Sequence, residues 1–151
     1  MYESSKRCFF AIFTRESPSA ALELAKRIKI LTESSARVEE AAQALECLPE
    51  SIAKTISLVL EDKNVLVVMA GDAKADNKKY KTYFGKRAKM FPKELVEDLI
   101  GHLPDDVCPF AINSNVDVYL DRSLKRFDFV YLAVKPEILC KSTNAIYTLI
   151  L

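Results

Sequence analysis

Two apolar segments that lie close together in the sequence constrain the fold of this chain more than any other feature. Residues 53–60 and 65–70 are rich in branched apolar side chains, and the residues between them, 61–64, are all polar. A spacer of this length is typical of a hairpin loop. We therefore predict an antiparallel pair of strands, against which the other elements must pack.

The remaining sequence mixes helical patterns with short strand patterns. Apolar residues recur at helical spacing from Val38 to Leu45, and Pro92 and Gly101 are suitable start and stop signals for another helix. Helices are predicted near 17–26, after Ser34 and Ser35, and at 92–100, and strands at 28–31, 107–112, 116–120 and 129–134. Because no repeat or linker interrupts this order, we predict a single α+β domain over residues 1–151.

Composition and spacing exclude several classes of protein. The apolar run at 8–13 is too short for a membrane helix, and the four cysteines and one histidine lack the spacing of a zinc site. The sequence also lacks the glycine-rich motifs of phosphate loops and dinucleotide-binding folds. We therefore predict a cytoplasmic, globular protein that uses no metal and no cofactor.

Lys54 is a candidate functional residue because it begins an otherwise apolar row. Strand alternation places it on the same face as Ile56, Leu58 and Leu60. One interpretation is a lysine at a strand end that extends its amine into solvent. The other is an ammonium at the mouth of a pocket, where it would attract a substrate carbonyl or phosphate. The pattern alone leaves both interpretations open.

The segment 74–93 is strongly basic, although the whole chain has a net charge of only +1. It contains eight Lys and Arg residues, a single acid, and the aromatic residues Tyr80, Tyr83 and Phe84. This mixture is typical of surfaces that neutralise phosphates and stack on bases. A solvated charged helix has the same composition and is the alternative. The candidate RNA-binding residues are Lys74, Lys78, Lys79, Lys81, Lys86 and Arg87.

A loop with two prolines, at 101–110, follows the helix predicted at 92–100. A stiff loop with unpaired N–H groups suits the binding of a carbonyl or an ester, although an ordinary connection fits equally well. His102 and Cys108 suggest a base and a nucleophile, but the sequence gives neither an orienting partner, which favours a lining role. Further on, Asp121 and Ser123 lie in a pattern that predicts a capped helical turn, with substrate orientation as the alternative.

Several of these segments, in this order, resemble the YbaK and prolyl-tRNA-synthetase-associated family of aminoacyl-tRNA deacylase domains. The resemblance extends from about Ile30 to Ala133, and its several separate motifs make it more specific than any one of them. The motifs are VEEAA at 38–42, IAKT at 52–55, AGDAK at 70–74, NKK at 77–79, GH at 101–102, VCPF at 107–110 and VYLDRSL at 118–124.

This resemblance implies a mixed, barrel-like sheet flanked by helices, and an enzyme that hydrolyses small amino acids wrongly attached to tRNA, usually tRNA for proline. It implies aminoacyl-tRNA as the partner and allows an aminoacyl-tRNA synthetase as a second one, with no membrane and no DNA. Lys54 and Gly101 occupy the positions expected of catalytic residues. The positions expected to bind substrate are His102, Cys108, Pro109, Phe110, Asp121 and Ser123.

The loop sequence also permits a second interpretation. Where the family favours glycines around its Cys-Pro-Phe run, this chain has Asp105, Asp106 and Ala111. Carboxylates disfavour the approach of phosphates, and the loss of glycine restricts the loop backbone. The leading prediction is therefore an active trans-editing hydrolase, and the alternatives are a catalytically silent module that binds tRNA or a synthetase, and an unrelated small-molecule-binding domain.

Overall fold

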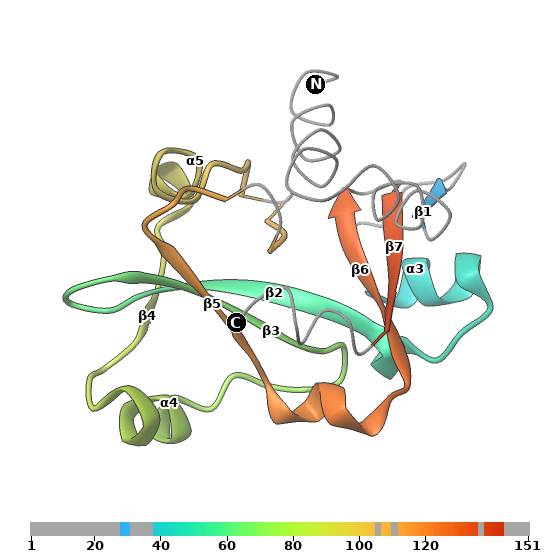
Figure 1. Ribbon diagram of the computed structural model, residues 1–151, viewed down its shortest axis with the longest axis horizontal. Coiled ribbons are helices and arrows are strands. Elements are labelled where there is room, and N and C mark those ends of the chain that lie inside the picture. Colours follow the sequence, from blue (N-terminus) through green and yellow to red (C-terminus); the bar gives the residue numbers. More distant parts are fainter. Residues whose placement is uncertain (1–27, 31–37, 105–106, 110–111, 136–137, 144–151) are drawn as a thin grey trace.

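The computed structural model describes residues 28–30, 38–104, 107–109, 112–135 and 138–143. A long hairpin formed by β2 (Ile52–Val59) and β3 (Asn64–Ala70) crosses the centre of the molecule (Figure 1). The two strands pair antiparallel, with Ala53 opposite Ala70 and Lys54 opposite Met69. The predicted hairpin is thus confirmed, and its loop closes with a hydrogen bond from the Leu60 N–H to the Lys63 carbonyl.

The hairpin belongs to a seven-stranded mixed sheet in the order β1-β7-β6-β2-β3-β5, with β4 paired to β2 off this path. The pairs β2–β6 and β3–β5 are parallel, and the others are antiparallel. Within the described residues the sheet is open, ending at β1 and β5. The predicted α+β class with a mixed sheet is confirmed. The other strands are β1 (Ile28–Ile30), β4 (Lys89–Met90), β5 (Val116–Leu120), β6 (Phe129–Lys135) and β7 (Ile138–Thr143).

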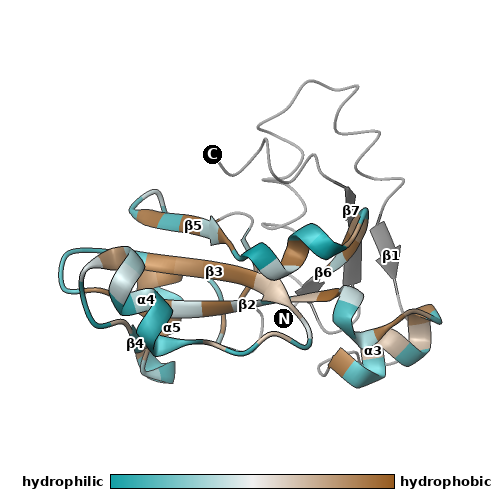
Figure 2. Ribbon diagram, turned by 90° about the horizontal axis from the view of Figure 1, so that it is seen from below, coloured by the Kyte–Doolittle hydropathy of each residue, from teal (hydrophilic) through white to brown (hydrophobic). Residues whose placement is uncertain are grey.

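The central strand β3 holds the hydrophobic core together. Every residue from Val65 to Ala70 is buried, and successive side chains enter different parts of the core. Leu66, Val68 and Ala70 pack in two of the core clusters, whereas Val65, Val67 and Met69 pack together in a third, with Leu58 and Tyr80. Figure 2 shows β3 as hydrophobic along most of its length. Burial on both faces explains why this strand is a continuous apolar run rather than an alternating one.

Among the described residues, three α-helices flank the sheet: α3 (Val38–Leu45), α4 (Asn77–Phe84) and α5 (Lys93–Ile100). Figure 1 shows α4 and α5 on opposite sides of the β2–β3 hairpin. The predicted apolar stripe of α3 is confirmed by buried Ala41 and Ala42, and α5 begins after Pro92 and ends at Gly101, as predicted. No helix in the described part of the chain is long and apolar enough to span a membrane.

The strand predicted at 107–112 is wrong. Its described residues, 107–109 and 112, are irregular. Pro109 lacks the N–H that a strand needs for its ladder, and this explains the failure. The short strands β4 and β7 were not predicted, whereas β5 has the predicted bounds and β1 and β6 match to within a residue. The helix predicted at 17–26 lies outside the described residues.

Candidate active site

Lys54 is held against the main chain at the end of the central hairpin. Its side chain is half-buried, and its Nζ donates a hydrogen bond of 3.1 Å to the carbonyl oxygen of Gly71. An ammonium has three N–H donors, so this bond leaves two for other partners. The amine is therefore anchored rather than extended freely into solvent, while its place at the mouth of a pocket stays a prediction.

Gly71 lies where only glycine fits. A Cβ atom at this position would lie 2.3 Å from the Pro49 carbonyl oxygen and 2.8 Å from that of Ile52. The Gly71 N–H donates to the Glu50 carbonyl oxygen at 3.4 Å. The turn after β3 is thus pressed against the short 3₁₀ helix η1 (Pro49–Ser51), and this contact fixes the carbonyl that receives the Lys54 amine.

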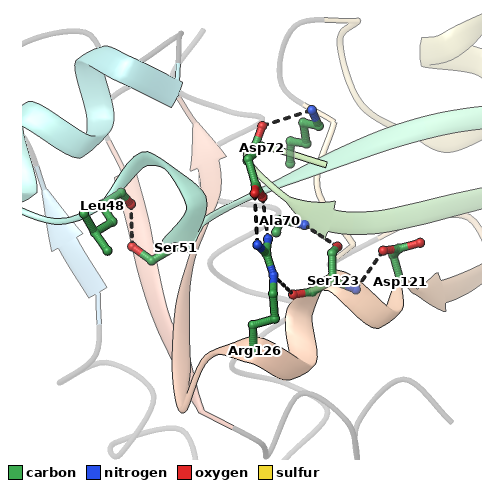
Figure 3. A network of polar contacts seen from close by, with 9 residues as sticks. Leu48, Ser51, Ala70, Asp72, Asp121, Ser123 and Arg126 are labelled. Carbon is green, nitrogen blue, oxygen red and sulfur yellow. Dashed lines mark hydrogen bonds and ion pairs between the residues drawn. The ribbon is translucent and has the colours of Figure 1, made fainter. Parts of the chain in front are cut away.

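An ion pair lies beside this turn (Figure 3). Arg126 reaches across from the 3₁₀ helix η2 (Arg122–Arg126), and its Nη1 and Nη2 bind the two carboxylate oxygens of Asp72, at 3.0 and 2.5 Å. Its Nε donates to the Ser123 carbonyl oxygen at 3.1 Å, which fixes the direction of the guanidinium. Hydrogen bonding by Arg126 lowers the pKa of Asp72, and the charge of Lys54 adds a smaller effect in the same direction.

Asp121 and Ser123 connect η2 to the same part of the sheet. The Asp121 carboxylate accepts from the Ser123 N–H at 2.8 Å, so the predicted cap of a helical turn is confirmed. The Ser123 hydroxyl accepts from the Ala70 N–H at 3.1 Å, and the Asp121 N–H donates to Val68. Ser123 through its side chain and Asp121 through its backbone therefore hold the end of β3 in place, and the predicted contact of their side chains with substrate stays a prediction. We call Lys54, Gly71, Asp72, Ser123 and Arg126 the β3-end network.

The loop after α5 forms a second candidate region. Gly101 adopts the left-handed conformation, with φ of 97°, and its N–H donates to the Glu97 carbonyl oxygen at 2.9 Å. Asn113 donates from its backbone to Ile100 and from its side chain to Asp98, both at 3.0 Å. The chain thus returns to the end of α5 after the loop. Since the Gly101 N–H is used in ending the helix, Gly101 cannot offer it to a substrate carbonyl without breaking that bond.

The predicted substrate-binding residues of this loop are buried. His102 is 4% exposed and Cys108 is fully buried, and the Cys108 Sγ lies 3.9 Å from the His102 Nε2. Pro109 is also buried. The contact brings the predicted base and nucleophile together, yet their burial fits the lining role favoured by the sequence. Phe110 lies outside the described residues.

The predicted RNA-binding residues lie on and around α4. Asp76 caps the helix by accepting from the Lys78 and Lys79 N–H groups at 2.9 and 3.2 Å, and both lysines are exposed. Lys86 forms ion pairs with Glu61 and Asp62 at 3.8 and 3.3 Å. Of the six predicted residues, the other five, Lys74, Lys78, Lys79, Lys81 and Arg87, are exposed and have no ion pair with another described residue.

Sequence reasoning missed three members of the β3-end network, namely Gly71, Asp72 and Arg126. The available signal was the Gly-Asp pair that directly follows a buried strand, because a glycine there indicates a turn or a close approach of backbone. Arg126 had no comparable signal. It is separated from Asp72 by 54 residues, and only the folded chain brings the two together.

This arrangement of strands and helices is that of solved structures of the tRNA-editing fold. The chain matches a proposed trans-editing enzyme for prolyl tRNA synthetase with a TM-score of 0.83 and 26% identity, over 95% of this chain and 88% of that one. It also matches a scaffold protein from computational epitope backbone grafting, with a TM-score of 0.84 and 24% identity, over 97% and 91% of the two chains.

The sequence assigns the family directly. Residues 32–144, well over half of the chain, match the aminoacyl-tRNA editing domain, and the chain belongs to this family. It is also 43% identical to the uncharacterized protein YwhH of Bacillus subtilis (strain 168) over 113 residues. These aligned residues cover 74% of this chain and 68% of that protein. The resemblance found in the sequence motifs is thereby confirmed.

Proposed function

We propose that this chain is a trans-editing hydrolase that removes a wrongly attached amino acid from tRNA. The observation that carries the proposal is the half-buried Lys54, whose amine is anchored on a main-chain carbonyl within an aminoacyl-tRNA editing domain. The structural match to a proposed trans-editing enzyme for prolyl tRNA synthetase supports tRNA for proline, or a related tRNA, as the substrate. A small amino acid is what the family resemblance implies.

The proposed reaction is hydrolysis of the ester between the amino acid and a terminal ribose. Water adds to the ester carbonyl carbon and loses one proton to the surrounding water, so the tetrahedral intermediate carries its negative charge on the former carbonyl oxygen. The bond to the ribose oxygen then breaks, and that oxygen takes a proton, which releases the amino acid. An ester of this kind is already labile, so positioning and oxyanion stabilisation can supply most of the acceleration without a protein nucleophile.

Lys54 supplies the positive charge in this mechanism. The two N–H groups of its ammonium that do not bind Gly71 are available to the developing oxyanion. Asp72 would weaken that charge if it paired with Lys54. Arg126 prevents this, because it binds both oxygens of the Asp72 carboxylate. The ion pair therefore leaves the Lys54 amine without a competing carboxylate, so that its remaining N–H groups can face the substrate.

The loop after α5 completes the proposed pocket. We assign Gly101 the role of setting the direction in which the loop leaves α5, and not that of donating its N–H. The buried side chains of His102, Cys108 and Pro109 form the wall that limits the size of the amino acid. Asp121 and Ser123 support the proposed pocket indirectly, because they hold the end of β3 in place.

The experiment measures deacylation of tRNA charged with Ala, Cys, Ser or Thr, using the full chain and its Lys54→Ala variant. We expect hydrolysis of at least one small-residue substrate and a loss of roughly 10²-fold or more in the variant. Binding of tRNA without turnover of any substrate would instead identify a silent module. An affinity for tRNA that is absent or independent of salt would contradict both, because phosphate contacts weaken steeply with salt.

A further inference from the structure

Tyr83 on α4 is the most exposed large apolar side chain in the described part of the chain, at 72%. Its neighbours on the helix behave differently. Tyr80 is only 8% exposed, and Phe84 packs against the same core cluster as Tyr80. Tyr80 and Phe84, four residues apart, share the face of α4 that packs on the core, whereas Tyr83 lies at the edge of this face and stays exposed.

The Tyr83 ring is held in place although it is exposed. It makes T-shaped contacts with Phe84, at 5.1 Å and 89°, and with Tyr119 on β5, at 6.0 Å and 82°. Phe84 and Tyr119 are themselves in T-shaped contact at 5.1 Å. A ring that is already fixed loses little conformational entropy when a ligand stacks on it.

Tyr119 is itself held in place by Lys63. Lys63 donates to the Tyr119 hydroxyl at 2.7 Å and to the Asp117 carboxylate at 3.0 Å, and its Nζ lies 5.1 Å from the centre of the Tyr119 ring. These hydrogen bonds raise the pKa of Lys63, so it stays charged and bound. Tyr83, Phe84 and Tyr119 therefore form a cluster of three rings in mutual contact, of which Tyr83 is the exposed one.

The charges around Tyr83 favour an anionic ligand. Lys79 lies four residues before Tyr83 and shares its face of α4. The nearby acids are already engaged, because Asp76 caps α4, Asp117 binds Lys63, and Glu61 and Asp62 pair with Lys86. An exposed aromatic ring flanked by unpaired cations is the arrangement that binds single-stranded nucleic acid, with bases on the ring and phosphates on the cations.

We propose that Tyr83 is a stacking platform for an unpaired base of the RNA substrate, with Lys79 on the adjoining phosphate. This inference deepens the proposed function and rests on it, since it takes the single-stranded end of a tRNA as the ligand. A docked protein is the competing occupant, but Lys79, which shares the face of Tyr83 and pairs with no acid among the described residues, favours RNA.

The test measures the affinity of the full chain for uncharged tRNA and for a labelled 12-nucleotide single-stranded RNA by fluorescence anisotropy. Tyr83→Ala should weaken binding roughly 5- to 100-fold, because one stacked base contributes that much. Tyr83→Phe keeps the π face and should stay within about twofold of the wild type. The slope of log affinity against log salt should not change in Tyr83→Ala, since no charge is lost.

Leu48→Ala is the matched control, because Leu48 is 67% exposed and apolar but has no aromatic face. It should leave RNA affinity unchanged. The inference is overturned if Tyr83→Ala binds within twofold of the wild type, or if Tyr83→Phe is as damaging as Tyr83→Ala. A deacylation assay distinguishes failure of this inference from failure of the proposed function. A wild-type chain that hydrolyses no mischarged tRNA, yet needs the Tyr83 ring to bind RNA, would remove the proposed hydrolase activity and keep the stacking platform.

Discussion

The β3-end network and the surface of α4 use charged side chains in opposite ways. In the network, Asp72 and Arg126 satisfy each other, and the Lys54 amine is tied to a carbonyl. On α4, Lys78, Lys79 and Lys81 are exposed and form no ion pair with another described residue. Paired charges fix geometry, whereas unpaired charges attract a distant anion. We therefore expect changes in the network to lower the rate of hydrolysis, and changes on α4 to lower affinity.

The largest effect is expected from Gly71→Ala. A Cβ atom at this position would meet the Pro49 carbonyl oxygen at 2.3 Å, so the turn must move. We expect the free energy of unfolding to fall by about 3 kcal/mol, and deacylation to fall with it because Lys54 loses its anchor. Urea unfolding measures the first effect and single-turnover kinetics the second.

Gly85→Ala is the control for that substitution. Gly85 ends α4 with φ of 68°, and a Cβ atom there would meet nothing within 4 Å. Only the left-handed backbone conformation is penalised, at about 1 kcal/mol. Equal losses of stability in the two variants would contradict the close packing of Gly71.

Removing the guanidinium with Arg126→Met should lower kcat roughly tenfold. The freed Asp72 carboxylate would then compete for the Lys54 amine. The double variant Arg126→Met/Asp72→Asn removes that competitor and should recover part of the rate, at saturating mischarged tRNA. If the double variant is as slow as Arg126→Met, the ion pair does not act by protecting the Lys54 charge.

The ion pair also predicts a pH dependence of stability. The folded pKa of Asp72 lies below its ordinary value of 3.8, mainly because of the hydrogen bonds from Arg126. Its contribution to the free energy of unfolding is therefore present above about pH 4 and is lost as the pH falls through the folded pKa. Urea unfolding of the wild type and Asp72→Asn should differ at pH 7 and converge in acid. A constant difference across this range would refute the assignment.

The smallest expected effect concerns single lysines on and near α4. Lys79→Ala should reduce the slope of log affinity for tRNA against log salt by roughly 0.7 to 0.9, as for one lost phosphate contact. Lys86→Ala should change it less, because Glu61 and Asp62 already neutralise Lys86. Equal slopes for the two variants would show that pairing with acids does not distinguish the lysines.

Local patterns predicted the parts of the fold that depend on neighbours in sequence. The hairpin followed from two apolar runs and a short spacer, and the end of α5 followed from Gly101. The strand predicted at 107–112 failed because its apolar residues fill the core from an irregular loop, in which Val107 and Ile112 pack beside α5. Apolar content alone does not distinguish a strand from an irregular loop whose side chains pack in the core. The strand β7 (Ile138–Thr143) was missed because its second half, Lys141–Thr143, is polar.

Local signals likewise identified some residues of the candidate site and missed those joined by long-range contacts. Lys54 was found because it begins an otherwise apolar row on a strand, which is a local signal. The cap formed by Asp121 was also found from its immediate neighbours. The Asp72–Arg126 pair was not found, because its two members are 54 residues apart in the sequence and only the folded chain brings them together. Long-range polar contacts of this kind carry no periodicity that a single sequence can display.

The central claim is that the anchored ammonium of Lys54 stabilises the charge that forms during ester hydrolysis. The most direct measurement is single-turnover hydrolysis of mischarged tRNA by the wild type and by Lys54→Met, which keeps the length of the side chain and removes its charge. We predict a rate constant lower by roughly 10²-fold or more, with unchanged unfolding behaviour and tRNA affinity. A correctly folded Lys54→Met variant that hydrolyses the ester at the wild-type rate would contradict the claim.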